Sequence, residues 1–68
     1  MDTKYSNCLQ TIMEEKRITY RRLERLTGIS RSTLHRIANY ELSPTQNTMI
    51  SIAKGLKMQV SDIFNLKY

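Results

Sequence analysis

Residues 19–39 read TYRRLERLTGISRSTLHRIAN, and this stretch predicts two short helices joined by a tight turn at residues 28–30. Gly28 suits the left-handed residue that ends a helix, because it has no Cβ to clash at positive φ. Ser30 can then accept a hydrogen bond from the free N–H groups of the second helix. Apolar residues on both sides of the turn fall at helical spacing and predict one shared core, formed by Leu23, Leu26, Ile29, Leu34 and Ile37.

The outward positions of the second helix are rich in hydrogen-bond donors: Arg31, Ser32, His35, Arg36 and Asn39. This is the pattern of a helix-turn-helix, in which the second helix enters the major groove of DNA. Helix pairs that turn at a glycine also occur in proteins that bind no nucleic acid. The turn alone therefore leaves the function open.

The basic residues are concentrated around the same motif. The chain has 68 residues and a formal net charge of +5, and residues 16–36 hold seven Lys and Arg residues against Glu24 alone. Such an excess is often only a solvated face. Its position on an element that could enter a groove favours a polyphosphate partner, which would release counterions on binding.

The rest of the composition argues against several other classes. A chain of this length is predicted to form a single domain over residues 1–68. Cys8 is the only cysteine and His35 the only histidine, so no disulfide, metal cluster or catalytic dyad suggests itself. We therefore expect no enzyme activity, no cofactor and no metal. No apolar run approaches the roughly 18 residues of a membrane span and no signal-peptide core is found, so a cytoplasmic protein is expected.

Three further helices are predicted, which gives an all-α, compact bundle of five short helices without strands. The first is expected to run from a cap at Asp2 or Thr3 to about Lys16. Its expected buried stripe is Tyr5, Cys8, Leu9, Ile12 and Met13.

The fourth and fifth helices are expected after a loop at residues 39–44. Thr45 can cap the fourth helix, and Gln59 or Ser61 can cap the last. Their expected inward residues are Met49, Ile52, Ala53 and Leu56, followed by Ile63, Phe64 and Leu66.

The start of the second predicted helix is a candidate phosphate site. Thr19 is its expected cap, and the free N–H groups at a helix N-terminus bind anions. Tyr20 and either Arg21 or Arg22 could assist. The alternative is that Thr19 only caps the helix and Tyr20 only packs against its neighbours.

The order and spacing of these elements resemble the lambda-repressor-like domain, the Cro and phage-repressor type (XRE family) of helix-turn-helix regulator. The resemblance covers nearly the whole chain and rests on apolar positions, the turn and three later motifs. These are Leu9 and Ile12, then Thr19, Leu23, Gly28, Ile29, Ser30, Ser32, Leu34 and Ile37, then Ser43-Pro44-Thr45, IAKGL at 52–56 and SDIF at 61–64.

The resemblance also implies which residues would contact DNA. Bases would be read by Arg31, Ser32 and Arg36, and His35 beside them could reach a base or a phosphate. An arginine can donate two hydrogen bonds to guanine O6 and N7, so at least one G·C pair per half-site is expected. The expected contacts to the DNA backbone are Thr19, Tyr20, Arg22, Ser30, Thr33, Asn39, Tyr40, Ser43 and Thr45.

Three residues depart from the family pattern. Tyr20 stands where Gln is usual, and Ala38 stands where an acidic residue is common. Glu24 stands where the family prefers a small Ala packed between the two helices. An unpaired carboxylate there would be costly, so Glu24 is expected to face solvent or to pair with an arginine such as Arg21, Arg25 or Arg36.

The predicted function is a sequence-specific transcriptional regulator, a repressor, that binds double-stranded DNA with its third helix in the major groove. The resemblance implies a homodimer on a two-fold symmetric operator, in a nucleoid-associated protein of prokaryotic, phage or mobile-element origin. Dimer contacts are expected in the last helix and tail, at about 60–68, from Phe64, Leu66 and Tyr68, although Phe64 could instead complete the core. The alternative function is a protein-interaction module on the same fold, such as an antitoxin that holds its toxin.

Overall fold

The computed structural model describes residues 5–66 and, within them, the side chains of residues 7–64. The described chain contains five helices: α1 (Leu9–Lys16), α2 (Tyr20–Thr27), α3 (Arg31–Ala38), α4 (Gln46–Leu56) and α5 (Val60–Ile63). Two short strands, β1 (Tyr5–Asn7) and β2 (Phe64–Leu66), pair near the two ends of the chain. The predicted five-helix fold is confirmed, and the paired strands are an addition that the sequence pattern did not suggest.

Local signals begin α2, α3 and α4 where the sequence predicts. The side-chain oxygens of Thr19, Ser30 and Thr45 each accept a hydrogen bond from the backbone N–H three residues further on, at 3.1, 3.3 and 3.2 Å. Gly28 ends α2 in the left-handed conformation, with φ 79°. The turn between α2 and α3 therefore has the predicted geometry.

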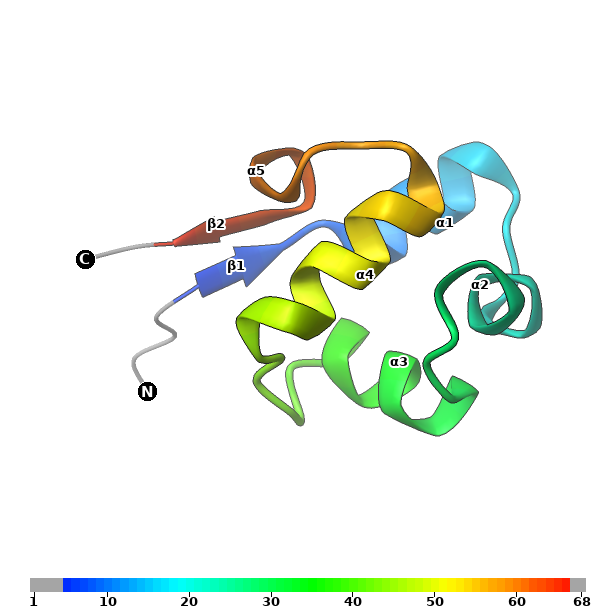
Figure 1. The fold of residues 1–68 in the computed structure, drawn as a ribbon, viewed down its shortest axis with the longest axis horizontal. Helices are drawn as coiled ribbons and strands as arrows, with labels where there is room; N and C mark the ends of the chain where they lie inside the picture. Colours follow the sequence, from blue (N-terminus) through cyan, green and yellow to red (C-terminus); the bar gives the residue numbers. More distant parts are fainter. Residues whose placement is uncertain (1–4, 67–68) are drawn as a thin grey trace.

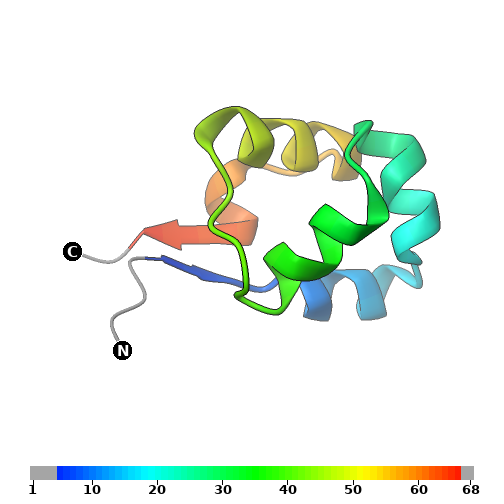
Figure 2. The same ribbon diagram turned by 90° about the horizontal axis from the view of Figure 1, so that it is seen from below.

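The helices close around one apolar core and leave α3 on an outer face. In Figure 1, α4 crosses the middle of the molecule, α2 lies at one end of the long axis, and the two strands lie at the other. Figure 2, seen from below, shows α3 across the face turned to the viewer. The fully or nearly fully buried residues are Leu9, Ile12, Met13, Leu23, Leu34, Ile37, Ala38, Ile52, Ala53, Leu56, Ile63 and Phe64.

Leu26 is the exception among the apolar residues that flank the turn. Its side chain is 42% exposed, whereas Leu23 is fully buried, so the prediction of Leu26 in the shared core is wrong. Thr27 takes the inward position instead, because residues four apart on a helix lie on nearly the same face. Its hydroxyl donates to the Leu23 carbonyl at 2.8 Å and accepts from the Ile29 N–H at 3.1 Å.

Gly55 lies at a close approach of α4 to the end of α2. A Cβ built at Gly55 would lie 2.7 Å from Cγ2 of Thr27 and 3.1 Å from the backbone oxygen of Leu26. Thr27 cannot turn away without losing the two hydrogen bonds of its hydroxyl. Only a residue without a side chain fits here.

Gly55→Ala is therefore expected to lower the free energy of unfolding by about 1–2 kcal/mol, because overpacking outweighs the gain in helix propensity. Urea denaturation followed by circular dichroism measures this change. Gly28→Ala is the matched control: its Cβ would meet no atom within 4 Å, so its cost would come only from the positive φ. A stabilising effect of Gly55→Ala would contradict the close approach.

The first helix is shorter than predicted. It begins at Leu9, and residues 5–7 form β1, which pairs antiparallel with β2 in the register Tyr5↔Leu66 and Asn7↔Phe64. The Cys8 N–H also donates to the Ile63 carbonyl at 3.0 Å. The proposed caps Asp2 and Thr3 lie outside the described residues. Pairing with a distant segment, which helical spacing cannot reveal, decides the conformation of Tyr5.

The last helix is also shorter than predicted. It ends at Ile63, and Phe64 is already extended, with φ −118° and ψ 121°. Gln59 is its cap, and the Asp62 carboxylate accepts a hydrogen bond from the Gln59 N–H at 3.0 Å. The expectation that Phe64 and Leu66 belong to this helix is wrong, because both residues form β2.

No helix in the described part of the chain is long and apolar enough to cross a membrane.

Candidate nucleic-acid interface

One face of α3 carries the four side chains predicted to read bases. Arg31, Ser32, His35 and Arg36 are all exposed, whereas Leu34 and Ile37 on the opposite face are fully buried. The four polar residues follow the spacing i, i+1, i+4 and i+5, which keeps them on one side of a helix. Packing of the apolar face thus orients the polar face outward.

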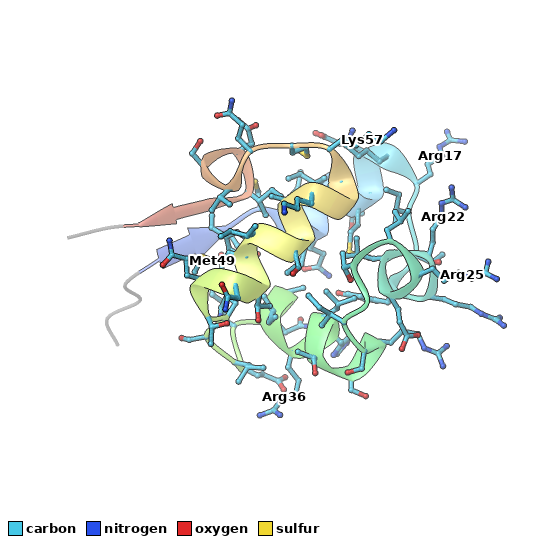
Figure 3. The ribbon with its side chains drawn as sticks, in the orientation of Figure 1. Arg17, Arg22, Arg25, Arg36, Met49 and Lys57 are labelled. Carbon is cyan, nitrogen blue, oxygen red and sulfur yellow. The ribbon has the colours of Figure 1, made fainter. Side chains whose placement is uncertain are left out.

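These four residues line one open concavity together with Tyr20 of α2. Arg36 extends from α3 beyond the lower edge of the molecule in Figure 3. The structure therefore brings the four predicted base-reading side chains together on one surface. The residues that line it carry guanidinium, hydroxyl and imidazole groups, which are donors suited to base edges and phosphates.

Tyr20 joins the start of α2 to this surface. Its ring packs edge-on against the His35 ring, with the ring centroids 5.3 Å apart and the planes at 62°. Burial raises the pKa of the Tyr20 hydroxyl above its ordinary value of 10.0, so this group stays protonated at neutral pH. Tyr20 thus packs against a neighbour, as one of the two interpretations expects, and a phosphate contact through its hydroxyl stays a prediction.

The hydroxyls predicted to contact the DNA backbone near the turn are engaged in capping. Ser30 accepts from the Thr33 N–H and donates to Oγ1 of Thr33 at 2.9 Å. Thr19 accepts from the Arg22 N–H. Their oxygens stabilise the helix starts, and the first N–H groups of any helix still lack partners within it. A phosphate would meet those N–H groups at the N-termini of α2 and α3.

The segment after α3 holds the remaining predicted backbone contacts. The Asn39 amide donates to the His35 carbonyl at 2.8 Å, Ser43 is exposed, and Thr45 caps α4. Tyr40 has φ 62°, and its hydroxyl accepts from the Asn7 N–H and donates to the Asn7 carbonyl, each at 2.9 Å. Its single proton is already used, so a Tyr40–phosphate contact would have to break the bond to Asn7.

Arg22 does not line the concavity on α3. In Figure 3 it extends, with Arg17 and Arg25, from the edge of the molecule at α2, away from Arg36. A contact from Arg22 to DNA would therefore reach a flanking phosphate and not a base, and it stays a prediction.

Glu24 forms an ion pair that the sequence did not identify. Its Oε1 lies 3.2 Å from Nε of Arg31, so the carboxylate of α2 holds the first residue of α3. The partner is Arg31, which is not among the three arginines named as examples in the prediction, Arg21, Arg25 and Arg36. The sequence pointed to an unusual contact at Glu24, because an acidic residue stands where a small residue is usual. It could not identify Arg31 as the partner, because that depends on how the turn places α3 beside α2.

The expected dimer contact at Phe64 is wrong. Its side chain is only 2% exposed and belongs to the core of its own chain, so it cannot form a surface for a partner. The side chain of Leu66 and all of Tyr68 lie outside the described parts of the structure. Among the side chains described, no group of three His, Cys, Asp or Glu residues could hold a metal ion.

A capped helix pair with a tight glycine turn, whose second helix presents a polar face outside the core, defines the class of helix-turn-helix domains. The profile of the Cro/C1-type HTH DNA-binding domain matches residues 8–67. The chain therefore belongs to the Cro/C1-type family of helix-turn-helix DNA-binding domains, which confirms the resemblance seen in the sequence. No curated protein sequence is significantly similar to it.

Proposed function

We propose that this protein is a transcriptional regulator that binds double-stranded DNA sequence-specifically and acts as a repressor by occupying an operator. One observation carries this proposal: Arg31, Ser32, His35 and Arg36 converge on a single exposed surface of α3. In a helix-turn-helix, this surface enters the major groove, where base edges differ in their pattern of donors and acceptors.

The side chains on this surface have distinct roles in the proposal. Arg31 and Arg36 supply guanidinium forks that match O6 and N7 of guanine, and Ser32 adds a hydroxyl that can donate or accept. Tyr20 of α2 and His35 of α3 line the same concavity, from which they would reach a base or the adjacent phosphate. Phosphates on either side would be held by the helix starts at Thr19 and Ser30, by Arg22, and by the segment after α3.

We further propose that two copies bind a two-fold symmetric operator. A single domain of 68 residues makes few contacts, and two half-sites about one helical turn apart would multiply them. Because Phe64 is buried, the dimer contacts that we propose are Leu66 and Tyr68. DNA is the proposed partner.

Selection from random duplexes tests this proposal. The wild type is expected to enrich a two-fold symmetric sequence with at least one G·C pair in each half-site. Arg31→Ala is expected to lose preference at one base pair of each half-site, with an affinity loss of about 5- to 150-fold per lost fork. Arg22→Ala is the comparison, and it is expected to weaken all sequences alike.

The possible outcomes separate the parts of the proposal. If no sequence is enriched, the protein is not a sequence-specific regulator. If one unsymmetrical site is enriched, the two-fold dimer is contradicted. If Arg31→Ala and Arg22→Ala behave alike, the division into base-reading and phosphate-binding residues is wrong.

A further inference from the structure

The ion pair between Glu24 and Arg31 joins the two helices of the motif at the proposed reading surface. Arg31 is the first residue of α3 and lines the concavity, and Glu24 lies in the middle of α2. The side chains of Arg31 and Glu24 are 60% and 39% exposed, so the pair lies at the surface. It is the one ion pair found among the side chains that the structure describes. Surface ion pairs add little to the free energy of unfolding, so a role of the Glu24–Arg31 pair in DNA binding is indicated rather than one in stability.

The contact uses one particular part of the arginine. The Glu24 carboxylate oxygen lies 3.2 Å from Nε, and the four N–H donors of the two terminal nitrogens remain. No hydrogen bond from those terminal nitrogens to another described residue is found. They are the end of the guanidinium that can donate in parallel to two acceptors, as guanine O6 and N7 require.

We propose that Glu24 is the positioning residue for Arg31 and that it thereby sets the preference for guanine at one base pair of each half-site. This inference rests on the proposed function. By fixing the guanidinium at Nε before DNA binds, Glu24 reduces the rotamer entropy that Arg31 loses on binding. It also disfavours a move of Arg31 to a phosphate, because that move would leave an unpaired carboxylate beside the polyanion. Arg31 is thus directed to base edges.

The test compares base preference in wild type, Glu24→Ala, Glu24→Gln and Arg31→Ala, using duplexes that differ at single positions of the selected operator. Glu24→Ala is expected to reduce discrimination about fivefold or more at the base pair affected by Arg31→Ala, and at no other. Glu24→Gln keeps the length of the side chain and a polar oxygen but removes the charge, and it is expected to restore part of the preference that Glu24→Ala loses. A double variant that combines Glu24→Ala with Arg31→Ala is expected to show the same base preference as Arg31→Ala alone.

Two controls exclude trivial causes. Glu41→Ala removes one negative charge from the exposed segment after α3 and is expected to raise affinity for all sequences without changing base preference. Thermal unfolding is expected to be nearly unchanged in Glu24→Ala, because alanine favours helix at a position that is not buried.

Several results would overturn the inference. Discrimination equal to the wild type in Glu24→Ala would show that Arg31 needs no support. An equal loss on every sequence, or relaxation at a different base pair, would show that Glu24 acts elsewhere. Sharper and tighter binding by Glu24→Ala would show that the carboxylate sequesters Arg31. In each of these cases an operator selected by the wild type would leave the proposed function intact, whereas failure of the wild type to select any site would remove both.

Discussion

Replacing Phe64 with alanine is expected to lower the free energy of unfolding by about 3–5 kcal/mol, the usual cost of removing a buried aromatic side chain. The ring is 2% exposed, and Phe64 begins the strand that pairs with Asn7 of β1. A domain of 68 residues has a total stability of roughly 3–10 kcal/mol, so this change would remove much of it. Denaturation in urea, followed by circular dichroism at several protein concentrations, measures the effect.

The matched control for this prediction is Leu26→Ala. It also removes a large apolar side chain, but one that is 42% exposed, so a loss below about 1 kcal/mol is expected. A core role for Phe64 requires the loss to be independent of protein concentration. If Phe64→Ala instead left the monomer stable and changed only an association equilibrium, the assignment of Phe64 to the core would be contradicted.

DNA affinity is expected to fall about 150- to 1,800-fold between 50 and 200 mM salt, if a dimer neutralises roughly four to six phosphates with Lys and Arg. The basis is the net positive charge around α2 and α3, where residues 16–36 carry seven basic residues and one acidic residue. Each phosphate contact releases condensed counterions, and added salt opposes that release. Fluorescence anisotropy of a labelled duplex over a salt series gives the slope.

Variants locate the charges that produce the salt slope. Arg22→Ala is expected to reduce it by about one per protomer. Lys57→Asn removes a charge at the edge opposite Arg36 in Figure 3 and is expected to leave the slope unchanged. Asparagine suits that site because Lys57 has φ 58°. A flat response of the wild type would contradict the phosphate contacts and would favour the protein-interaction alternative.

The helix-turn-helix could be predicted because its signals are local. Thr19, Ser30 and Thr45 each cap a helix through a hydrogen bond to a residue three positions on, and Gly28 turns the chain through its own φ. The outward face of α3 followed from helical periodicity, since the buried positions of one turn fix the exposed positions of the same turn. The predicted base-reading side chains therefore appeared together on the expected surface.

The errors in prediction fall where a residue's partner is distant in the sequence. Tyr5 read as helical because its spacing to Leu9 and Ile12 fits a stripe, yet Tyr5 pairs with Leu66. Leu26 was predicted to be buried because it is apolar and falls at helical spacing with its neighbours. In the structure α4 approaches α2 at Gly55, and Thr27 takes the inward position. Periodicity describes which residues share a face and not which neighbour that face meets.

The sequence by itself determined that there are five helices, the caps of α2, α3 and α4, the basic motif and the polar face of α3, because each depends on interactions within one or two helical turns. Only the tertiary structure decided that the two ends pair as strands, that Phe64 completes the core, and that Glu24 holds Arg31. Those features need two segments to meet in space, and their meeting is set by the packing of the whole chain around the buried residues.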